Sequence, residues 1–337
     1  MKRRAVIETA IGETRAAVYE GRRMVELHVD RPWMATPRTG DMYIGRVTSV
    51  DSSVAGAWVD IGSDAAPALM PFAAQKEMPK LAEGQAVEVS ILRSQIGAKG
   101  ATLRYLGESD AKPGLVKKLT LRERLLARFP DLTFDDAAVN AVDSACETSL
   151  ALPGGGSITM EQTQALLAID VDKGGADTAA AAANEAAKLI ASQLRLRGLG
   201  GLVVIDFPNL RQPKQRKTLE KTFEASCEAD PNVTKFNALS RFGVIEMTRS
   251  KPDLSLDDVL NTKYGEPTVA TQAIRALRRL TREAAVSAGA QLEMIVTPEI
   301  ESWLNDAPFD WRAEVTDRIG ARFKLVQGPS VDVKADR

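Results

Sequence analysis

The chain has little of the chemistry on which many catalytic and metal sites depend. Histidine occurs once, as His28, and cysteine twice, as Cys146 and Cys227. Two distant cysteines in no paired motif give no support to a disulfide framework or a cysteine-based zinc site, and they fit a reducing cytoplasm. His28 lies in an alternating Val-Glu-Leu-His-Val stretch that favours a structural place in a strand. Histidine-based catalysis and histidine-rich metal centres therefore lack their usual residues.

The sequence also lacks an excess of charge and a long apolar segment. Lys and Arg number 44 against 45 Asp and Glu, so any affinity for nucleic acid must come from local basic patches. The basic start at residues 1–4 is followed only by short apolar stretches, which excludes a signal peptide, and no later stretch approaches a membrane span. We expect a cytoplasmic protein, and its 337 residues predict two or three domains.

The first hundred or so residues are rich in strand patterns. Residues 4–32 predict short alternating strands, and residues 40–106 predict about five more, the size of a small OB-type barrel. Within this barrel, a period of two places Val59 inside and Trp58 outside, where Trp58 either stacks on a base or packs against a neighbouring domain. Lys99, in a glycine turn, is either a phosphate contact or a solvated lysine.

The segment between the barrel and the centre of the chain is less regular. Residues 107–115 indicate a hinge, residues 115–129 predict an amphipathic helix, and residues 134–147 predict a second helix. A triple glycine at 154–156 could cradle a phosphate, although a hairpin turn is the commoner role of such a loop.

The centre carries the most regular pattern. Residues 165–169 form a continuous apolar run, typical of a strand buried on both faces, and the run ends at Asp170. An alanine-rich helix follows to about residue 197, and a second apolar strand at 202–205 ends at Asp206. A strand–helix–strand unit of this kind places both carboxylates at the same edge of a sheet, where open α/β sheets bind their ligands.

The remaining residues predict further α/β structure. Pro213 can open a helix, residues 236–247 predict a strand region, and residues 251–268 predict a linker. A helix at 269–288 and a strand at 292–296 then form a small unit. One face of that helix carries a basic stripe that predicts a solvated surface, with RNA or a protein partner as the alternative. The stripe consists of Arg275, Arg278, Arg279 and Arg282.

Two or three carboxylates that converge at strand ends suit a hard divalent cation such as Mg²⁺. Such an ion neutralises a scissile phosphate and helps a bound water to ionise, which a chain without a usable histidine needs for phosphodiester hydrolysis. Asp170 and Asp206 could equally cap a helix or order a turn. Spacing alone therefore leaves metal binding and a local structural role open.

Three segments resemble the catalytic core of the ribonuclease E/G family. They are residues 152–172, ending in Leu-Leu-Ala-Ile-Asp-Val-Asp, residues 191–207, ending in Gly-Leu-Val-Val-Ile-Asp-Phe, and residues 239–249, Leu-Ser-Arg-Phe-Gly-Val-Ile-Glu-Met-Thr-Arg. Residues 40–103 are similar to the family's S1-type RNA-binding barrel, through Gly-Ala-Trp-Val-Asp-Ile-Gly and Ala-Lys-Gly-Ala-Thr-Leu. Weaker similarity covers residues 4–32 and the C-terminal unit, so the resemblance accounts for most of the chain.

The resemblance implies a multidomain architecture of the mixed α/β (α+β) class. An RNase H-like scaffold would occupy residues 1–36 and 107–150, with an S1-type OB-fold barrel inserted at 37–106. A DNase I-like catalytic subdomain at 151–250, a linker at 251–268 and a small C-terminal α/β domain at 269–337 would follow.

The resemblance also implies an activity. Members of this family are endoribonucleases that depend on Mg²⁺, with Mn²⁺ as a substitute, and cleave single-stranded RNA to 5'-phosphate and 3'-hydroxyl ends in RNA processing, rRNA processing included, or decay. The family's two metal-binding aspartates fall on Asp170 and Asp206, and Asp172 takes the position that orients the attacking water or phosphate. Trp58 takes the place of a base-stacking aromatic, and Lys99 that of an RNA-contacting lysine.

Several departures from the family pattern bear on activity. The family usually has Asn where this chain has Asp172, whose charge opposes an approaching phosphate, and Gln164 replaces a typical Glu. Only residues 107–114 are available for the family's 5'-end sensor, so we predict no sensing of 5'-monophosphates. Residues 251–268 lack the Cys-Pro-x-Cys zinc link, so no zinc-linked tetramer is expected, whereas a homodimer through other surfaces stays open.

Three hypotheses follow. The chain is a compact endoribonuclease; or it is an RNA-binding relative that has lost efficient chemistry, as Asp172 and Gln164 suggest; or it is a scaffold whose basic helix and small domain bind a protein partner. The sequence does not identify the RNA, because one barrel with one aromatic gives little base specificity.

Overall fold

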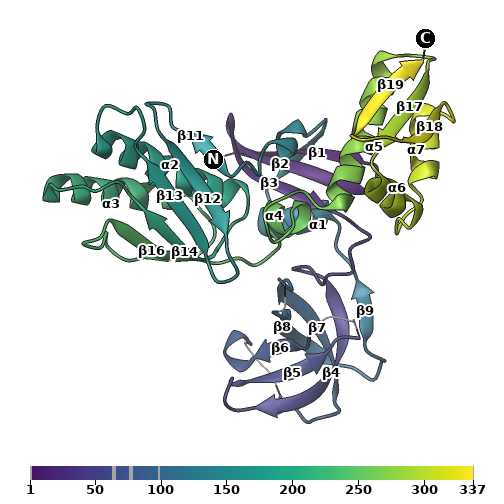
Figure 1. Ribbon diagram of the computed structural model, residues 1–337. Coiled ribbons are helices and arrows are strands. Elements are labelled where there is room, and N and C mark those ends of the chain that lie inside the picture. Colours follow the sequence, from purple (N-terminus) through teal and green to yellow (C-terminus); the bar gives the residue numbers. More distant parts are fainter. Residues whose placement is uncertain (1, 63–65, 76–78, 98, 337) are drawn as a thin grey trace.

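The computed structural model describes residues 2–62, 66–75, 79–97 and 99–336. Four β-sheets, one of them closed into a barrel, and seven α-helices form this part of the chain (Figure 1). A central sheet lies between a helix-covered sheet on one side and a small α/β unit on the other, with the barrel below. Within the described ranges, no helix is both long and apolar enough to cross a membrane. The predicted mixed α/β class is confirmed.

The central sheet consists mainly of the N-terminal strands that the alternating pattern predicts. Its members are β1 (Arg3–Ala10), β2 (Glu13–Glu20), β3 (Arg23–Asp30) and β10 (Thr133–Asp136). The first three strands are antiparallel neighbours, and β10 joins β1 in parallel. Helix α1 (Leu121–Arg128) packs Leu121 and Leu125 against one face, in a cluster with Ala5 and Val18.

Both helices expected between residues 115 and 147 differ from the structure. Helix α1 begins only at Leu121, because Thr120 and Glu123 form a capping box there, and the preceding residues form β9 (Gly114–Lys117) beside the barrel. The helix expected at 134–147 is wrong, since its first residues pair with β1 and only a short 3-10 helix (Asn140–Asp143) follows. Pairing with a distant strand outweighs local helical periodicity in both places.

A closed barrel follows the central sheet's first three strands. It consists of β4 (Met42–Asp51), β5 (Gly56–Asp60), β6 (Ala68–Pro71), β7 (Ala86–Arg93) and β8 (Thr102–Glu108). The strands pair in the order β4-β5-β6-β8-β7, and β7 returns to β4 to close the ring. Val59 and Ile61 are buried inside, whereas Trp58 lies half-buried on the outside, as the period of two predicted.

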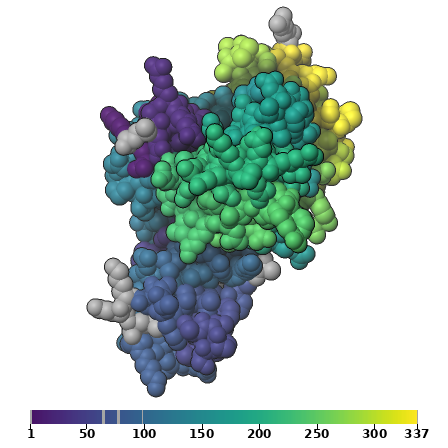
Figure 2. Space-filling view, turned by 90° about the vertical axis from the view of Figure 1, so that its left-hand side faces the viewer, coloured from purple at the N-terminus to yellow at the C-terminus, as the bar shows by residue number. Residues whose placement is uncertain are grey.

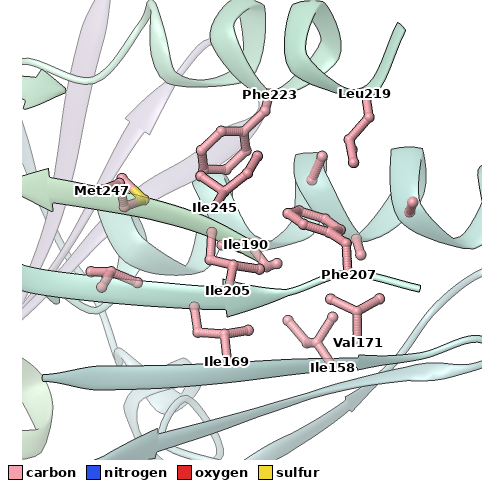
Figure 3. Close-up of a cluster of buried hydrophobic side chains, with 14 of the residues drawn as sticks. Ile158, Ile169, Val171, Ile190, Ile205, Phe207, Leu219, Phe223, Ile245 and Met247 are labelled. Carbon is pink, nitrogen blue, oxygen red and sulfur yellow. The ribbon is translucent and has the colours of Figure 1, made fainter. Parts of the chain in front are cut away.

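The helix-covered sheet carries the candidate residues. Its strands are β11 (Ser149–Ala151), β12 (Ser157–Gln162), β13 (Leu167–Asp172), β14 (Gly201–Asp206), β16 (Val244–Arg249) and β15 (Thr234–Phe236), in this spatial order. Helix α2 (Ala179–Leu196) joins β13 to β14, and α3 (Pro213–Cys227), opened by Pro213, follows β14. Figure 3 shows Ile169, Ile205 and Ile245 from three neighbouring strands beneath Phe223 of α3.

Only one face of this sheet is covered. Odd-numbered residues such as Ile169 and Ile205 pack against the helices and are 2% and 0% exposed. On the other face, Ala168 and Val204 are half-buried and Leu202 is 44% exposed. The expectation of a strand buried on both faces is therefore wrong, and we call the second side the open face.

The C-terminal part begins within the expected linker, which contains a short helix, α4 (Leu256–Leu260). The small unit then comprises α5 (Val269–Val286), β17 (Gln291–Val296), α6 (Pro298–Asn305), α7 (Trp311–Ile319), β18 (Phe323–Gln327) and β19 (Asp332–Asp336). Strand β17 lies in the middle of its sheet, parallel to β18 and antiparallel to β19. The predicted helix and strand of this unit are confirmed.

The basic stripe of α5 is solvated only in part, because Arg279 and Arg282 are exposed whereas Arg275 is half-buried and Arg278 is buried. Arg278 is 5% exposed and binds Glu8 of β1 at 2.7 and 3.1 Å. Arg282 bonds with Asp143 at 3.2 Å, and Arg275 donates to the Asp143 carbonyl. Arg279 pairs with Asp332 within the small unit. Three of the four arginines therefore join the small unit to β1 and to the 3-10 helix that follows β10.

A buried ionic cluster joins the barrel to the rest of the chain. Arg38 binds the Asp253 carboxylate at 2.6 and 3.0 Å, and Arg124 of α1 contacts Asp30 at 3.2 Å and Asp41 at 3.0 Å. Ser94, which follows the last residue of β7, donates to Asp253 at 2.6 Å. We call these residues the junction cluster. It ties the barrel to the segment that leaves the helix-covered sheet, and Figure 2 shows the barrel directly below that sheet.

Candidate active site

Two parallel strands position Asp170 and Asp206. The two residues are direct partners in the register of β13 and β14. Because alternate residues of a strand share a face, both carboxylates lie on the open face, away from the helices. Neighbouring strands are about 4.8 Å apart, so one small ion can lie within reach of both side chains. Strand β13 continues to Asp172, two residues beyond the predicted end.

The surroundings of this carboxylate pair suit a cation. Both side chains are exposed, and within the described ranges neither forms a hydrogen bond or an ion pair. Like charges directly opposite one another destabilise a sheet, and a divalent cation removes that repulsion. No group of three His, Cys, Asp or Glu side chains in the described part of the chain is placed to hold a metal. Mg²⁺ often takes only one or two carboxylates and completes its shell with water and substrate phosphate, so the pair fits this ion.

Asp172 lies in a different environment. It follows Asp170 on the same face, opposite Ser157 of β12, and its Oδ1 accepts a 2.9 Å hydrogen bond from the Gly174 amide. It therefore orders the turn that leads toward α2 while its side chain stays exposed. Gln164 is exposed in the turn before β13, outside the carboxylate pair.

The triple glycine forms a hairpin turn rather than a phosphate cradle. It joins β11 to β12, and Gly155 and Gly156 have φ values of 95° and 90°, which only glycine adopts readily. The Glu185 carboxylate on α2 accepts a 2.9 Å hydrogen bond from the Gly154 amide. The Gly154 amide, which a phosphate would need as a hydrogen-bond donor, is thus already bonded to a carboxylate.

Trp58 and Lys99 lie together in the wall of one open pocket on the outside of the barrel. The pocket has a volume of about 650 Å³, and its wall also includes Leu69 and Arg93, both from barrel strands. An aromatic face beside two cationic side chains is the combination that binds single-stranded nucleic acid by stacking and phosphate attraction. The alternation in β5 predicted that Trp58 points outward. The sequence pattern did not predict that Leu69 and Arg93 line the same pocket, because that depends on how the barrel strands pair.

One exposed aromatic near the carboxylate pair was missed by the sequence argument. Phe242 is 75% exposed, in the turn that precedes β16, and Val244 of β16 is the register partner of Asp206. The sequence argument treated residues 236–247 as one strand region, but Gly243, with φ of 90°, belongs to a tight turn inside it. Gly243 could have indicated a turn within this region, between one strand and the next.

Comparison with known proteins bears on the same residues. Residues 110–252 match the model of the ribonuclease E/G family. Ribonuclease E of Escherichia coli (strain K12) is 34% identical over 206 residues, 57% of this chain and 19% of that protein. Ribonuclease G of Haemophilus influenzae is 29% identical over 201 residues, 55% of this chain and 41% of that protein. Ribonuclease G of Escherichia coli (strain K12) is 32% identical over 174 residues, 48% of this chain and 35% of that protein.

The aligned regions thus span less than half the length of each of these relatives. The family match contains Asp170, Asp172 and Asp206, and the barrel residues Trp58 and Lys99 lie outside it. The match therefore rests on the part of the chain that carries the carboxylate pair. Residues 110–252 of this chain are thus distant homologues of the ribonuclease E/G family.

Proposed function

We propose that this chain is an endoribonuclease that hydrolyses single-stranded RNA to 5'-phosphate and 3'-hydroxyl ends, with Mg²⁺ or Mn²⁺ held by Asp170 and Asp206. The observation that carries the proposal is the pair of in-register carboxylates within the family match, which have no cationic partner among the described side chains. A cytoplasmic location and a role in RNA processing, rRNA processing included, or RNA decay belong to the same proposal. Both cysteines are free, as a reducing compartment requires.

The chain's own residues have distinct tasks in this proposal. When bound, Mg²⁺ supplies positive charge that offsets the scissile phosphate and lowers the pKa of water. Asp170 and Asp206 hold that ion at the open face. Asp172 keeps one oxygen on the Gly174 amide, and its other oxygen can orient the attacking water. Trp58 stacks on a base, and Lys99 offsets a backbone phosphate at the barrel pocket.

The domain assignment is part of the proposal. The pairing order of the barrel is that of a five-stranded OB-type fold, which supports an S1-type barrel at 37–106. We assign residues 1–36 and 107–150 to an RNase H-like scaffold and residues 151–250 to a DNase I-like subdomain. The linker at 251–268 and the small domain at 269–337 complete the chain.

The expected lack of 5'-end sensing follows from the same assignment. Strand β8 ends at Glu108 and β9 begins at Gly114, so five residues, 109–113, connect them. We expect equal cleavage of 5'-monophosphate and 5'-hydroxyl forms of one RNA, measured as kcat/KM. A strong preference for the monophosphate would contradict this expectation.

The central test is a cleavage assay on an A/U-rich single-stranded RNA, with Mg²⁺ and with EDTA. We expect Mg²⁺-dependent cleavage by the wild type and a loss of about 100-fold or more in Asp170→Asn and Asp206→Asn, because metal-ion catalysis contributes several kcal/mol. Asp177→Asn is the matched control, since Asp177 is also exposed and lies in the loop before α2. Activity that survives both substitutions would overturn the metal site. Tight RNA binding without cleavage by the wild type would favour an RNA-binding relative, a reading that Asp172 and Gln164 motivate.

A further inference from the structure

The turn that precedes β16 presents an aromatic side chain and a cation beside the carboxylate pair. Phe242 is 75% exposed, and the Arg241 guanidinium lies 4.7 Å from the centre of its ring. In the described part of the chain, Arg241 forms no ion pair with an acidic side chain. An apolar ring and a free cation at one exposed position form the combination that stacks on a base and attracts the adjoining phosphate.

This turn is anchored by hydrogen bonds, although its tip is exposed. The Gly243 amide donates to the Ser240 carbonyl at 3.0 Å, and the Ser240 amide donates to the Val244 carbonyl at 2.9 Å. The Phe207 amide donates to the Gly243 carbonyl at 3.0 Å. From α3, Arg216 donates to the carbonyls of Leu239 and Ser240 at 2.6 and 2.7 Å. An anchored turn loses little conformational entropy when it binds a ligand. The exposed ring therefore has a fixed place on the molecule.

The turn lies at the same end of the sheet as the proposed metal site. Asp170, Asp206 and Val244 occupy three successive strands in register, and Phe242 lies two residues before Val244. A side chain added at Gly243 would lie 3.0 Å from the Phe207 carbonyl oxygen and 4.0 Å from Asp206 Oδ1. Glycine thus lets the turn approach the carboxylate pair closely. A nucleotide whose phosphate lies at the pair would place a neighbouring base near Phe242.

We propose that Phe242 and Arg241 form a nucleotide subsite next to the carboxylate pair, in which Phe242 stacks on a base flanking the scissile phosphate and Arg241 binds the adjoining phosphate. This inference rests on the proposed function for the identity of its ligand. Because every base has a π-face, the subsite positions the RNA chain without selecting a sequence. It gives the RNA a second aromatic contact, on the helix-covered sheet, in addition to Trp58 on the barrel.

The test measures binding of a fluorescein-labelled, A/U-rich single-stranded RNA to the full chain by anisotropy, in EDTA so that no RNA is cut. We expect Phe242→Leu, which keeps the apolar volume and removes the ring, to weaken binding about tenfold, and Phe242→Tyr to stay within about twofold of wild type. Tyr264→Leu is the matched control and should bind like the wild type. Tyr264 is 80% exposed, and the Lys263 ammonium lies 4.9 Å from the centre of its ring, but it belongs to the loop between α4 and α5.

Two further measurements separate the contribution of base stacking from that of phosphate attraction. Arg241→Gln should lower the slope of log affinity against log salt by roughly 0.7, as expected for one phosphate contact on a single strand. An RNA with one abasic position opposite the turn should bind the wild type and Phe242→Leu equally. Wild-type binding by Phe242→Leu, or an equal loss in Tyr264→Leu, would overturn the subsite. So would a finding that Phe242→Leu changes only self-association in analytical ultracentrifugation.

The two proposals can fail separately. A wild type that cuts no RNA while the Phe242 variants differ as expected would overturn the proposed function and leave the subsite intact. A wild type that cuts RNA while Phe242→Leu binds and cuts normally would overturn the subsite alone.

Discussion

Two groups of aspartates in this chain have opposite surroundings. At the junction cluster, Asp30 and Asp41 are 5% and 0% exposed, and Arg38 and Arg124 pair with them. On the open face, Asp170 and Asp206 lie directly opposite one another, exposed and without a cationic partner among the described side chains. Burying a charge requires a partner, whereas an exposed pair can stay free for a ligand. The difference separates charges that hold the barrel to the rest of the chain from charges that are available for chemistry.

The largest expected effect on stability lies at the junction. Arg124→Met leaves the buried Asp41 without its ionic partner and should lower the free energy of unfolding by about 3–5 kcal/mol. Arg122→Met is the matched control on the same helix, since Arg122 forms an exposed pair with Asp136, and it should cost less than about 1 kcal/mol. Urea unfolding measures both. Similar losses in the two variants would contradict the contrast between the junction and exposed pairs.

Acid should weaken another buried pair in a defined window. Burial alone would raise the pKa of Glu26, but the hydrogen bond and charge of His28, with Arg128 and Arg195, lower it from 4.5 to about 2. A carboxylate whose pKa is lowered on folding stabilises the protein above its unfolded pKa and loses that contribution as pH falls. We expect the wild type to lose up to about 3 kcal/mol between pH 4.5 and pH 2 from this group, and Glu26→Gln to lack that loss. Urea unfolding at several pH values measures the free energy of unfolding of both proteins. An equal fall of this free energy in the wild type and in Glu26→Gln across the window would contradict the assignment.

On the open face, removal of a carboxylate should stabilise the fold and not destabilise it. In EDTA, Asp206→Asn removes the repulsion between opposed carboxylates, so it should stabilise the fold by a few tenths of a kcal/mol, up to about 1 kcal/mol. Thermal unfolding of wild type, Asp206→Asn and the Asp177→Asn control measures this. A destabilised Asp206→Asn would indicate that the carboxylate has a structural role.

Substitution of Asp172 should change kcat/KM by a similarly small free energy. Asn can still accept the hydrogen bond from the Gly174 amide, but it removes a negative charge near an approaching phosphate. A unit charge about 4 Å away is worth about 1 kcal/mol in water, so Asp172→Asn should raise kcat/KM about fivefold. A fall in kcat/KM would show instead that the Asp172 carboxylate takes part in the reaction.

Local patterns predicted the carboxylate pair, whereas distant contacts determined the features that were missed. Asp170 and Asp206 lie in one strand–helix–strand unit, where periodicities of two and 3.6 fix the fold. Arg278 looked solvated because its partner, Glu8, is 270 residues away in the chain. The subsite at Phe242 was missed because its meaning depends on β16 pairing beside β14, which no local pattern shows.

The most direct test of the metal site needs no RNA. Mg²⁺ that binds the folded chain raises its unfolding midpoint by mass action, so the wild type should show a midpoint that rises with Mg²⁺ concentration. Asp170→Asn and Asp206→Asn should each lose that dependence, and the Asp177→Asn control should keep it. A rise of equal size in all four proteins would contradict the assignment of Asp170 and Asp206 as the metal ligands.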